Sequence, residues 1–233
     1  MRLSIVIPAY NEEKRIEETL KAITSYFDQK DFGYEVIVID DGSKDRTSEK
    51  VLAFQNKNIR FLKNRRNRGK GYTVRRGMLE AEGETILFSD ADLSTPIHEY
   101  EKLSFWINRG YDIAIASRGL AESRILVRQK WWREQMGKIF NWLVRKTMGF
   151  SFRDTQCGFK LFTASAAKHI FSLQKTDGFS FDVEIILLAI RSRFRIKEVP
   201  VLWKNSFQSK VNPVLDSLKM LFSLWKIKTG KPH

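Results

Sequence analysis

Cysteine and histidine are scarce in this sequence, and long apolar runs are missing. The single cysteine, Cys157, cannot form an internal disulfide, and His98, His169 and His233 lack the spacing of metal ligands. This composition argues against a disulfide framework or a zinc centre and favours a reducing compartment such as the cytosol. No apolar run approaches the roughly 20 residues that span a bilayer, and the N-terminus lacks the pattern of a signal peptide. We therefore expect no membrane-spanning helix.

Acidic residues are outnumbered by basic ones, 27 against 41, which gives a formal net charge of +14 and an isoelectric point near 9.9. This charge favours a polyanionic partner, which could be nucleic acid, an anionic membrane surface or a phosphorylated substrate. The segment 57–76 alone carries many basic residues and no acidic one. The length of 233 residues, 42% of them hydrophobic, suffices for one large domain with an appendage.

Apolar runs and helical periodicity alternate along the chain. They predict strands at 3–7, 34–39, 59–62, 85–89 and 111–116. They predict helices at 12–27, from after 43 to about 53, at 69–81 and at 98–108. This alternation indicates an α/β fold with a mostly parallel sheet flanked by helices. We expect the sheet to end after the fifth strand. An extended segment at 154–162, a helix at 182–192, a strand at 196–201 and a basic tail from 205 follow.

Polar clusters follow the first, second and fourth predicted strands, where ligands bind in an open α/β sheet. Asp90 and Asp92 lie two apart at such a strand end, so both carboxylates can point to one side as hard oxygen ligands for Mg²⁺ or Mn²⁺. A solvated turn or a helix cap near Ser94 is the alternative, because Asp-x-Asp is a common pattern. Its position directly after a buried strand favours the metal site.

Four motifs occur in a fixed order: Ser-Ile-Val-Ile-Pro-Ala-Tyr-Asn-Glu at 4–12, Val-Ile-Asp-Asp-Gly-Ser at 38–43, Asn-Arg-Gly-Lys-Gly at 67–71 and Asp-Ala-Asp at 90–92. This order resembles glycosyltransferase family 2, which implies the Rossmann-like GT-A fold. Residues 92–96, 117–118 and 154–160 resemble its dolichyl-phosphate glucosyltransferase branch, which is close to the dolichyl-phosphate mannose synthases. We therefore divide the chain into a GT-A catalytic domain at 1–205 and a basic amphipathic tail at 206–233. Within the domain, 1–95 would be the nucleotide-sugar half and 96–205 the acceptor half.

The resemblance implies a donor site at the strand ends. The residues that it assigns to the nucleotide sugar are Pro8, Ala9, Tyr10, Glu12, Asp40, Lys70, Asp90 and Ala91. Lys70 starts a helix between two glycines, where backbone N–H groups and the helix dipole favour phosphate. Asp92 is expected to be catalytic and, with Asp90, to hold the metal ion. Turn and N-cap chemistry is the alternative for the clusters at 8–12 and 40–43.

The resemblance places an acceptor site in the second half. Arg118 and Arg133 match family positions for the acceptor phosphate, which suits arginine because its planar fork binds phosphate at two points. An ion pair with an aspartate of the metal site is the alternative for Arg118, and a surface position is the alternative for Arg133. Asp154 matches a candidate catalytic carboxylate, which would act as a base on a hydroxyl acceptor but would only orient groups around a phosphate acceptor. Lys160 and Glu184 are weaker candidates.

Two segments have the composition of basic amphipathic helices that lie in a membrane interface. A helix within 124–147 would place Trp132, Met136, Ile139, Phe140 and Leu143 on one side with basic residues opposite, and 213–228 repeats the pattern. Packing of the first stripe onto the sheet is an equal alternative. We expect peripheral binding to an anionic membrane surface from the cytoplasm, with homodimerisation as the alternative use of this surface.

The resemblance, together with these features, implies an inverting glycosyltransferase that moves a sugar, with glucose from UDP-glucose as the expected donor, to a polyprenyl or dolichyl phosphate with Mg²⁺ or Mn²⁺. Glucose is favoured because Ser94 stands where the mannose synthases of this family tend to carry glutamine. Transfer to a hydroxyl of a polysaccharide, protein or lipid is the second hypothesis. A nucleic-acid-binding module is the third, but it leaves the ordered motifs unexplained, so we expect no nucleic-acid partner.

Overall fold

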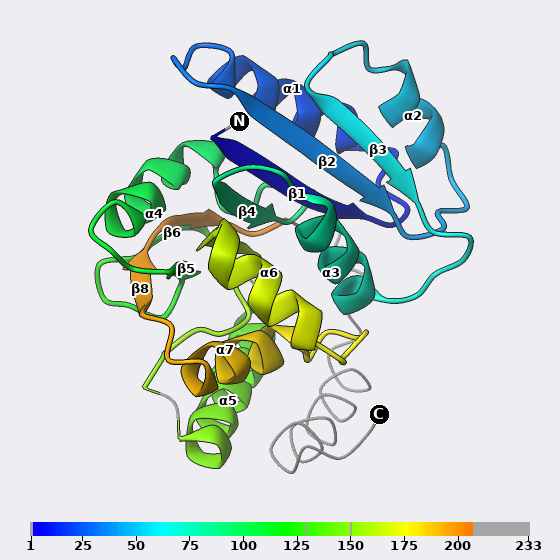
Figure 1. Ribbon diagram of the computed structural model, residues 1–233. Helices are drawn as coiled ribbons and strands as arrows, with labels where there is room; N and C mark the ends of the chain where they lie inside the picture. The colour runs from blue at the N-terminus through cyan, green and yellow to red at the C-terminus, as the bar shows by residue number, and fades with distance from the viewer. Residues whose placement is uncertain (1, 129, 150, 207–233) are drawn as a thin grey trace.

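The computed structural model describes residues 2–206, except 129, 150 and the side chain of Arg133. Its strands are β1 (Leu3–Ala9), β2 (Tyr34–Asp40), β3 (Ile59–Lys63), β4 (Thr85–Ser89), β5 (Ile113–Ser117), β6 (Arg124–Val127), β7 (Phe159–Thr163), β8 (Ile196–Pro200) and β9 (Leu202–Lys204). Its helices are α1 (Ile16–Phe27), α2 (Thr47–Ala53), α3 (Lys70–Glu80), the short η1 (Ile97–Glu99), α4 (Tyr100–Ile107), α5 (Trp131–Met148), α6 (Ala164–Leu173) and α7 (Phe181–Arg191). Figure 1 shows their arrangement.

Seven strands form one sheet in the order β3-β2-β1-β4-β7-β5-β8, and β7 is antiparallel to both of its neighbours. The other pairings within this sheet are parallel, so the expected mostly parallel sheet is confirmed. The expectation that the sheet ends after the fifth strand is wrong, because β7 inserts between β4 and β5, and β8 pairs with β5. This insertion depends on long-range pairing that local sequence patterns do not report.

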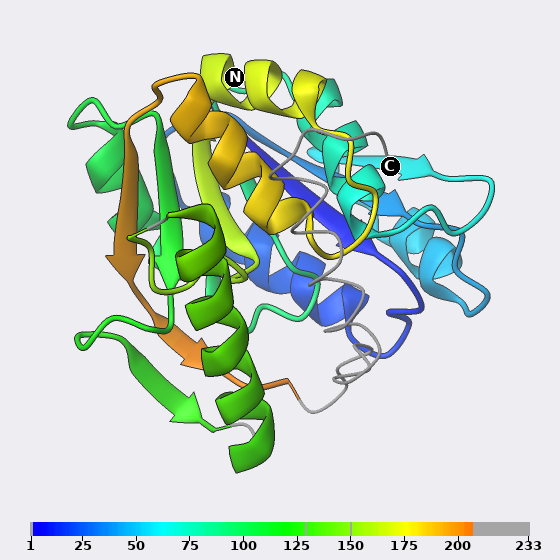
Figure 2. The same ribbon diagram turned by 90° about the horizontal axis from the view of Figure 1, so that it is seen from below.

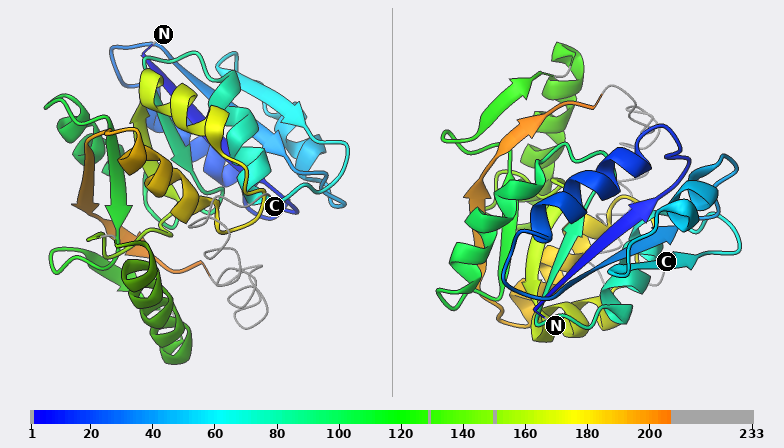
Figure 3. Two further views of the ribbon diagram at one scale, coloured as in Figure 1. Left: turned by 60° about the horizontal axis from the view of Figure 1, so that its bottom comes forward. Right: turned by 90° about the horizontal axis from the view of Figure 1, so that it is seen from above.

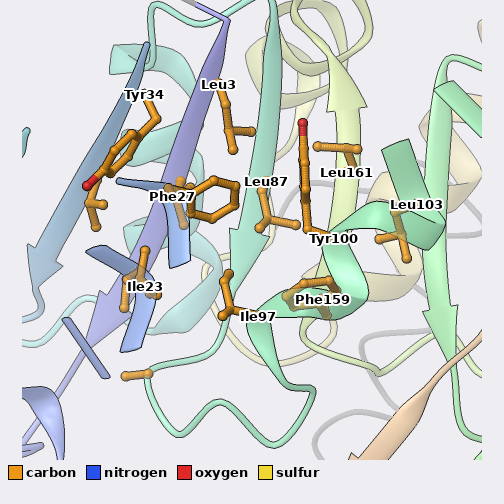
Figure 4. Packing of buried hydrophobic residues seen from close by; sticks show 14 of the residues in the cluster. Leu3, Ile23, Phe27, Tyr34, Leu87, Ile97, Tyr100, Leu103, Phe159 and Leu161 are labelled. Carbon is orange, nitrogen blue, oxygen red and sulfur yellow. The ribbon is translucent and has the colours of Figure 1, made fainter. Parts of the chain in front are cut away.

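Helices cover both faces of the sheet, which gives three layers (Figure 1). One core lies between the sheet and α1, α2 and α4, and the other lies between the sheet and α3, α6 and α7. Phe27 lies at the centre of the first core, where its ring centroid is 5.5 Å from that of Tyr34 and 5.3 Å from that of Tyr100 (Figure 4). Truncating so buried a phenylalanine to alanine costs about 3–5 kcal/mol.

Helix α1 begins at Ile16 rather than at residue 12. Residues 12–15 form a turn instead, in which the Glu12 carbonyl accepts hydrogen bonds from the amides of Arg15 and Ile16. The Glu12 amide donates to the Thr47 hydroxyl at 2.7 Å, which ties this turn to the start of α2. The end of the first strand is thereby held against the loop that follows the second.

The second half of the chain adds a smaller unit beside the main sheet. Strands β6 and β9 pair with each other, and α5 lies next to β6 and projects from the body of the molecule (Figures 2 and 3). The predicted apolar stripe of α5 is split, because Phe140 is buried whereas Ile139 is 58% exposed. Trp131 and Trp142 are also exposed, by 75% and 50%. One face of α5 therefore packs on the core, and another presents aromatic side chains to the surface.

Within the described part of the chain, no helix is both long and apolar enough to cross a membrane. The predicted amphipathic segment at 213–228 lies outside the described residues. The division into a catalytic domain and a tail remains a prediction, as do the two halves within the domain.

Candidate active site

The carboxyl ends of β1, β2 and β4 meet at one edge of the sheet. Ala9 and Asp40 are paired in register, and the Asp41 amide donates to the Ala9 carbonyl at 2.8 Å. Asn11, in the left-handed region with φ of 53°, donates its amide to the Ser43 hydroxyl at 2.8 Å. The clusters at 8–12 and 40–43 are therefore in direct contact, as the parallel topology predicts.

Asp40 is buried in this contact with no exposed surface. One carboxylate oxygen accepts the Ser43 amide at 2.9 Å, and the other accepts the Ser48 hydroxyl. Pro8 and Tyr10 are half-buried nearby, and Glu12 forms an ion pair with Arg15. The predicted contact of Asp40 with the nucleotide sugar remains a prediction.

Asp41 holds the loop that leads to Lys70. Its carboxylate accepts hydrogen bonds from the Asn64 amide group at 2.7 Å and from the backbone amides of Arg68 and Gly69, both at 2.9 Å. Gly69 has a φ of 100°, which favours glycine, and Lys70 is the first residue of α3. Asp41, which was not singled out above, thereby fixes the start of the helix that carries Lys70.

Lys70 and Asp90 form an ion pair, with 2.6 Å between Lys70 Nζ and Asp90 Oδ1. Burial alone would lower the pKa of Lys70, but the negative charges of Asp90, Asp182 and Asp92 outweigh it and raise the pKa. Asp90 also donates its amide to the Gly158 carbonyl, and a Cβ at position 158 would lie 2.0 Å from Asp90 Oδ2. Gly158 is therefore the residue that leaves room for the Asp90 carboxylate.

Asp92 lies beside this pair and is partly accessible. Its Oδ1 accepts the Ser94 amide at 2.9 Å, and its Oδ2 lies 3.9 Å from Arg15 Nη1. Burial and the negative charge of Asp90 raise the pKa of Asp92. Two neighbouring carboxylates that repel each other favour a cation between or beside them, so the donor set fits a hard divalent metal ion.

The two aspartates have no further carboxylate, histidine or cysteine beside them to complete a three-residue metal site in the described part of the chain. The described residues contain no group of three or more histidine, cysteine, aspartate or glutamate side chains that could hold a metal ion. Because Lys70 is bound to Asp90, Asp92 is the carboxylate better placed for direct metal contact.

Asp154 and Arg118 form a second buried ion pair. Asp154 is 1% exposed and accepts from Arg118 Nε at 2.6 Å, from Nη2 at 2.9 Å and from the Arg118 amide at 3.0 Å. Burial alone would raise the pKa of Asp154, but the charge and hydrogen bonds of Arg118 hold it below its usual value. The partner of Arg118 is thus Asp154, not an aspartate of the metal site.

A basic cavity of about 440 Å³ opens beside this pair. Its lining residues come from α5, β6, β9 and the segments around Arg118 and Asp154. They include Arg118, Arg128, Lys138, Arg145, Arg153, Glu134, Asp154 and Trp203. Arg133 lies in the first turn of α5, but its side chain is outside the described part, so its predicted phosphate contact stays a prediction.

A second cavity of about 360 Å³ adjoins Asp92. Its lining includes Lys14, Arg15 and Lys204, none of which was singled out from the sequence. Arg15 lies three residues after Glu12, and this spacing was the only local signal for their ion pair. The contact of Lys204 with this region depends on tertiary structure, because its amide donates to the Ser94 carbonyl at 2.8 Å.

Comparison with known proteins decides the family. Glycosyl transferase family 2 matches residues 4–171 of the chain. The chain belongs to glycosyl transferase family 2. A dolichyl-phosphate beta-glucosyltransferase of Drosophila melanogaster is 37% identical over 243 residues, which cover 97% of this chain and 74% of that protein. The Homo sapiens protein of the same name is 36% identical over 94% of this chain and 72% of its own length.

Solved structures share the fold of this family 2 chain. Glucosyl-3-phosphoglycerate synthase from Mycobacterium tuberculosis, in complex with Mn²⁺, UDP and glucosyl-3-phosphoglycerate, superimposes with a TM-score of 0.73 at 18% identity. The match covers 100% of this chain and 81% of that one. A second complex of that enzyme, with Mn²⁺, UDP-glucose and phosphoglyceric acid, gives a TM-score of 0.74 at 17% identity, with 100% and 81% covered. The expected GT-A fold is confirmed.

Proposed function

We propose that this family 2 member is an inverting glucosyltransferase that moves glucose from UDP-glucose to the phosphate of a dolichyl or other polyprenyl phosphate. The observation that carries this proposal is the similarity to dolichyl-phosphate beta-glucosyltransferases, which extends over 94–97% of the chain. Two further observations support it. The clusters at 8–12 and 40–43 are in contact with each other, and a basic cavity lies beside Arg118.

The donor would bind at the carboxyl edge of the sheet. Pro8, Ala9, Tyr10, Glu12 and Asp40 would surround the base and ribose, and Lys70 would face the diphosphate with Asp90 and Ala91 beside it. A divalent cation, Mg²⁺ or Mn²⁺, held by Asp92 and supported by Asp90, would neutralise charge on the leaving diphosphate. Arg15 would add positive charge on the Asp92 side, because its guanidinium lies 3.9 Å from that carboxylate.

The acceptor phosphate would bind in the cavity beside Arg118. Arg145 Nε, which is buried and has no hydrogen-bond partner within the described chain, supplies a further donor in this cavity. Arg118, held in place by Asp154, would bring a phosphate oxygen in line with the anomeric carbon. The new bond to C1 forms as the bond from C1 to the diphosphate oxygen breaks, so UDP leaves with the electron pair and the configuration inverts.

No general base is needed for this reaction, because a phosphate monoester is already ionised near neutral pH. The bonding and the pKa of Asp154 fit a reaction that needs no base. Its carboxylate is occupied by Arg118 and its pKa is lowered, whereas a base works best with a pKa near the operating pH. Transfer to a hydroxyl acceptor would need a base, and the ion pair and the lowered pKa of Asp154 do not favour that role.

The surface formed by α5 and β6 would adsorb to an anionic membrane that presents the lipid acceptor. Trp131, Trp142 and Leu126 are at least half exposed there, and basic residues flank them. Replacing both tryptophans with serine should reduce sedimentation with phosphatidylserine vesicles several-fold while leaving UDP binding unchanged. Unchanged sedimentation, together with a loss of dimer, would assign this surface to self-association instead.

A donor screen tests the proposed activity. UDP-glucose, UDP-galactose, GDP-mannose and GDP-glucose are each offered with a polyprenyl phosphate and Mn²⁺ or Mg²⁺, and lipid-linked sugar is measured. UDP-glucose should be the preferred donor, and EDTA should abolish transfer. A preference for a GDP-sugar would contradict the proposed donor.

A further inference from the structure

A second lysine lies buried behind the donor site. Lys160 in β7 has no exposed surface, and its ammonium group donates to the Cys157 carbonyl at 2.7 Å and to the Asp182 carboxylate. Asp182 lies in the first turn of α7 and is 3% exposed. The pair is thus fully enclosed, and no step proposed above uses it.

This pair lies directly beneath Lys70 and Asp90. Lys160 is paired in register with Phe88 of β4, and Phe88 lies two residues before Asp90. The ammonium groups of Lys70 and Lys160 lie 5.3 Å and 5.7 Å from the centroid of the Phe88 ring. The two lysines therefore lie against the same ring, and the Lys160 ammonium is hydrogen-bonded to the Asp182 carboxylate.

Stability alone does not explain a buried ion pair of this kind. Desolvation of two charges largely offsets their attraction, and apolar residues of similar volume often stabilise a core at least as well. The neighbours on the same side of the sheet are apolar: Phe88, Phe181 and Val183 have no exposed surface. A methionine and a leucine could fill this space, so the charges are better explained by what they do to their neighbours.

We propose that Lys160 is a positioning residue for the donor site: by neutralising Asp182, it leaves the Lys70 ammonium group to Asp90 and the donor diphosphate. Without Lys160, the buried Asp182 carboxylate would lose its ion-pair partner, and the Lys70 ammonium group, which lies against the same Phe88 ring, would be drawn inward toward it. This inference rests on the proposed function, because it takes Lys70 and Asp90 to face the diphosphate. It adds a residue that touches neither donor nor acceptor.

The test measures the dissociation constant of UDP in the presence of Mn²⁺ by calorimetry, using the full chain below its unfolding temperature. Lys160→Met should weaken UDP binding about 10- to 100-fold, as loss of a supporting outer-shell residue typically does. Lys160→Met/Asp182→Leu should restore binding to near wild type, because the competing carboxylate is gone. Adding Lys160→Met to Lys70→Met should change the constant little, because the residue through which it acts is absent.

Controls separate positioning from a general loss of structure. Lys168→Met removes another lysine, whose ammonium donates to the Ala81 carbonyl at 2.6 Å at the far end of α3, and should leave UDP binding unchanged. Lys160→Gln keeps hydrogen-bond donors without the charge, and it replaces Lys160→Met under the same criteria if that variant does not fold.

The outcomes are distinguishable. Wild-type UDP affinity in the folded Lys160 variant, or an equal loss in the Lys70→Met background, would overturn the role of Lys160 and leave the donor site standing. Wild-type affinity in Lys70→Met would overturn the assignment of the donor site and this inference with it.

Discussion

The replacement of Asp154 by asparagine distinguishes an orienting carboxylate from a catalytic base. Asparagine keeps the shape of the side chain but removes the charge that binds Arg118 through its Nε and Nη2 atoms. Breaking a buried ion pair by removing one partner costs about 3–5 kcal/mol. Because the Arg118 side chain is 29% exposed, we expect the lower end of this range. A loss of about 3 kcal/mol corresponds to a fall in Tm of roughly 6–12 °C for a chain of this size.

Steady-state kinetics with UDP-glucose and a polyprenyl phosphate give the decisive comparison. If Asp154 orients Arg118, Asp154→Asn should raise the acceptor KM by about tenfold, or about 1.4 kcal/mol, with a smaller change in kcat. Adding the same substitution to Arg118→Met should then have little further effect. A general base would instead contribute about 10²–10⁴ to the rate. A kcat loss of that size at unchanged acceptor KM, repeated in the Arg118→Met background, would refute the orienting role.

The pH dependence of stability has a definite sign for this pair. The folded-state pKa of Asp154 lies below its unfolded value, so the ion pair contributes its full stability above the unfolded pKa near 3.9. That contribution is lost as the pH falls through the folded-state pKa. The difference in unfolding free energy between wild type and Asp154→Asn should stay constant from neutral pH down to about 5 and shrink below about 4, as measured by denaturant titration.

Two further predictions concern Gly158 and Cys157, and one concerns the metal ion. Gly158→Ala would place a Cβ 2.0 Å from Asp90 Oδ2, so we expect UDP binding to weaken by about tenfold or more. Gly33→Ala, where nothing lies within 4 Å of the new Cβ, should bind UDP normally. Cys157 is 2% exposed and burial raises its pKa to about 11, so iodoacetamide should label it at pH 8 only after denaturation. Rapid labelling of the native protein would contradict its burial. Removal of divalent cations should abolish transfer, and Mn²⁺ or Mg²⁺ should restore it; full activity after chelation would refute a metal requirement.

The contact between the 8–12 and 40–43 clusters was predictable because polar residues follow buried apolar runs, and parallel strands bring such ends together. The ion pair between Lys70 and Asp90 does not follow from this topology alone, because β3 and β4 are not neighbours in the sheet and Lys70 is placed by the loop before α3. The hydrogen bonds that Asp41 accepts were not predictable from the sequence. Its three acceptor contacts reach residues 64–69, and their positions depend on how the loop before α3 folds back.

The second half of the chain was less predictable for physical reasons. Strand β7 pairs antiparallel in the middle of the sheet, which no local periodicity signals. Helix α6 was not predicted, although Thr163 provides an N-cap by accepting the Ala166 amide. The stripe expected on α5 mixed residues of two faces, because a helix with both a core face and an exposed aromatic face has no single apolar side.

The transfer of radiolabelled glucose from UDP-glucose to polyprenyl phosphate tests the central claim most directly. The wild-type protein with Mn²⁺ should move label into the organic phase, and Asp92→Ala should not. Label that stays water-soluble when polyprenyl phosphate is present, with the wild-type protein folded and binding UDP, would contradict the proposed acceptor.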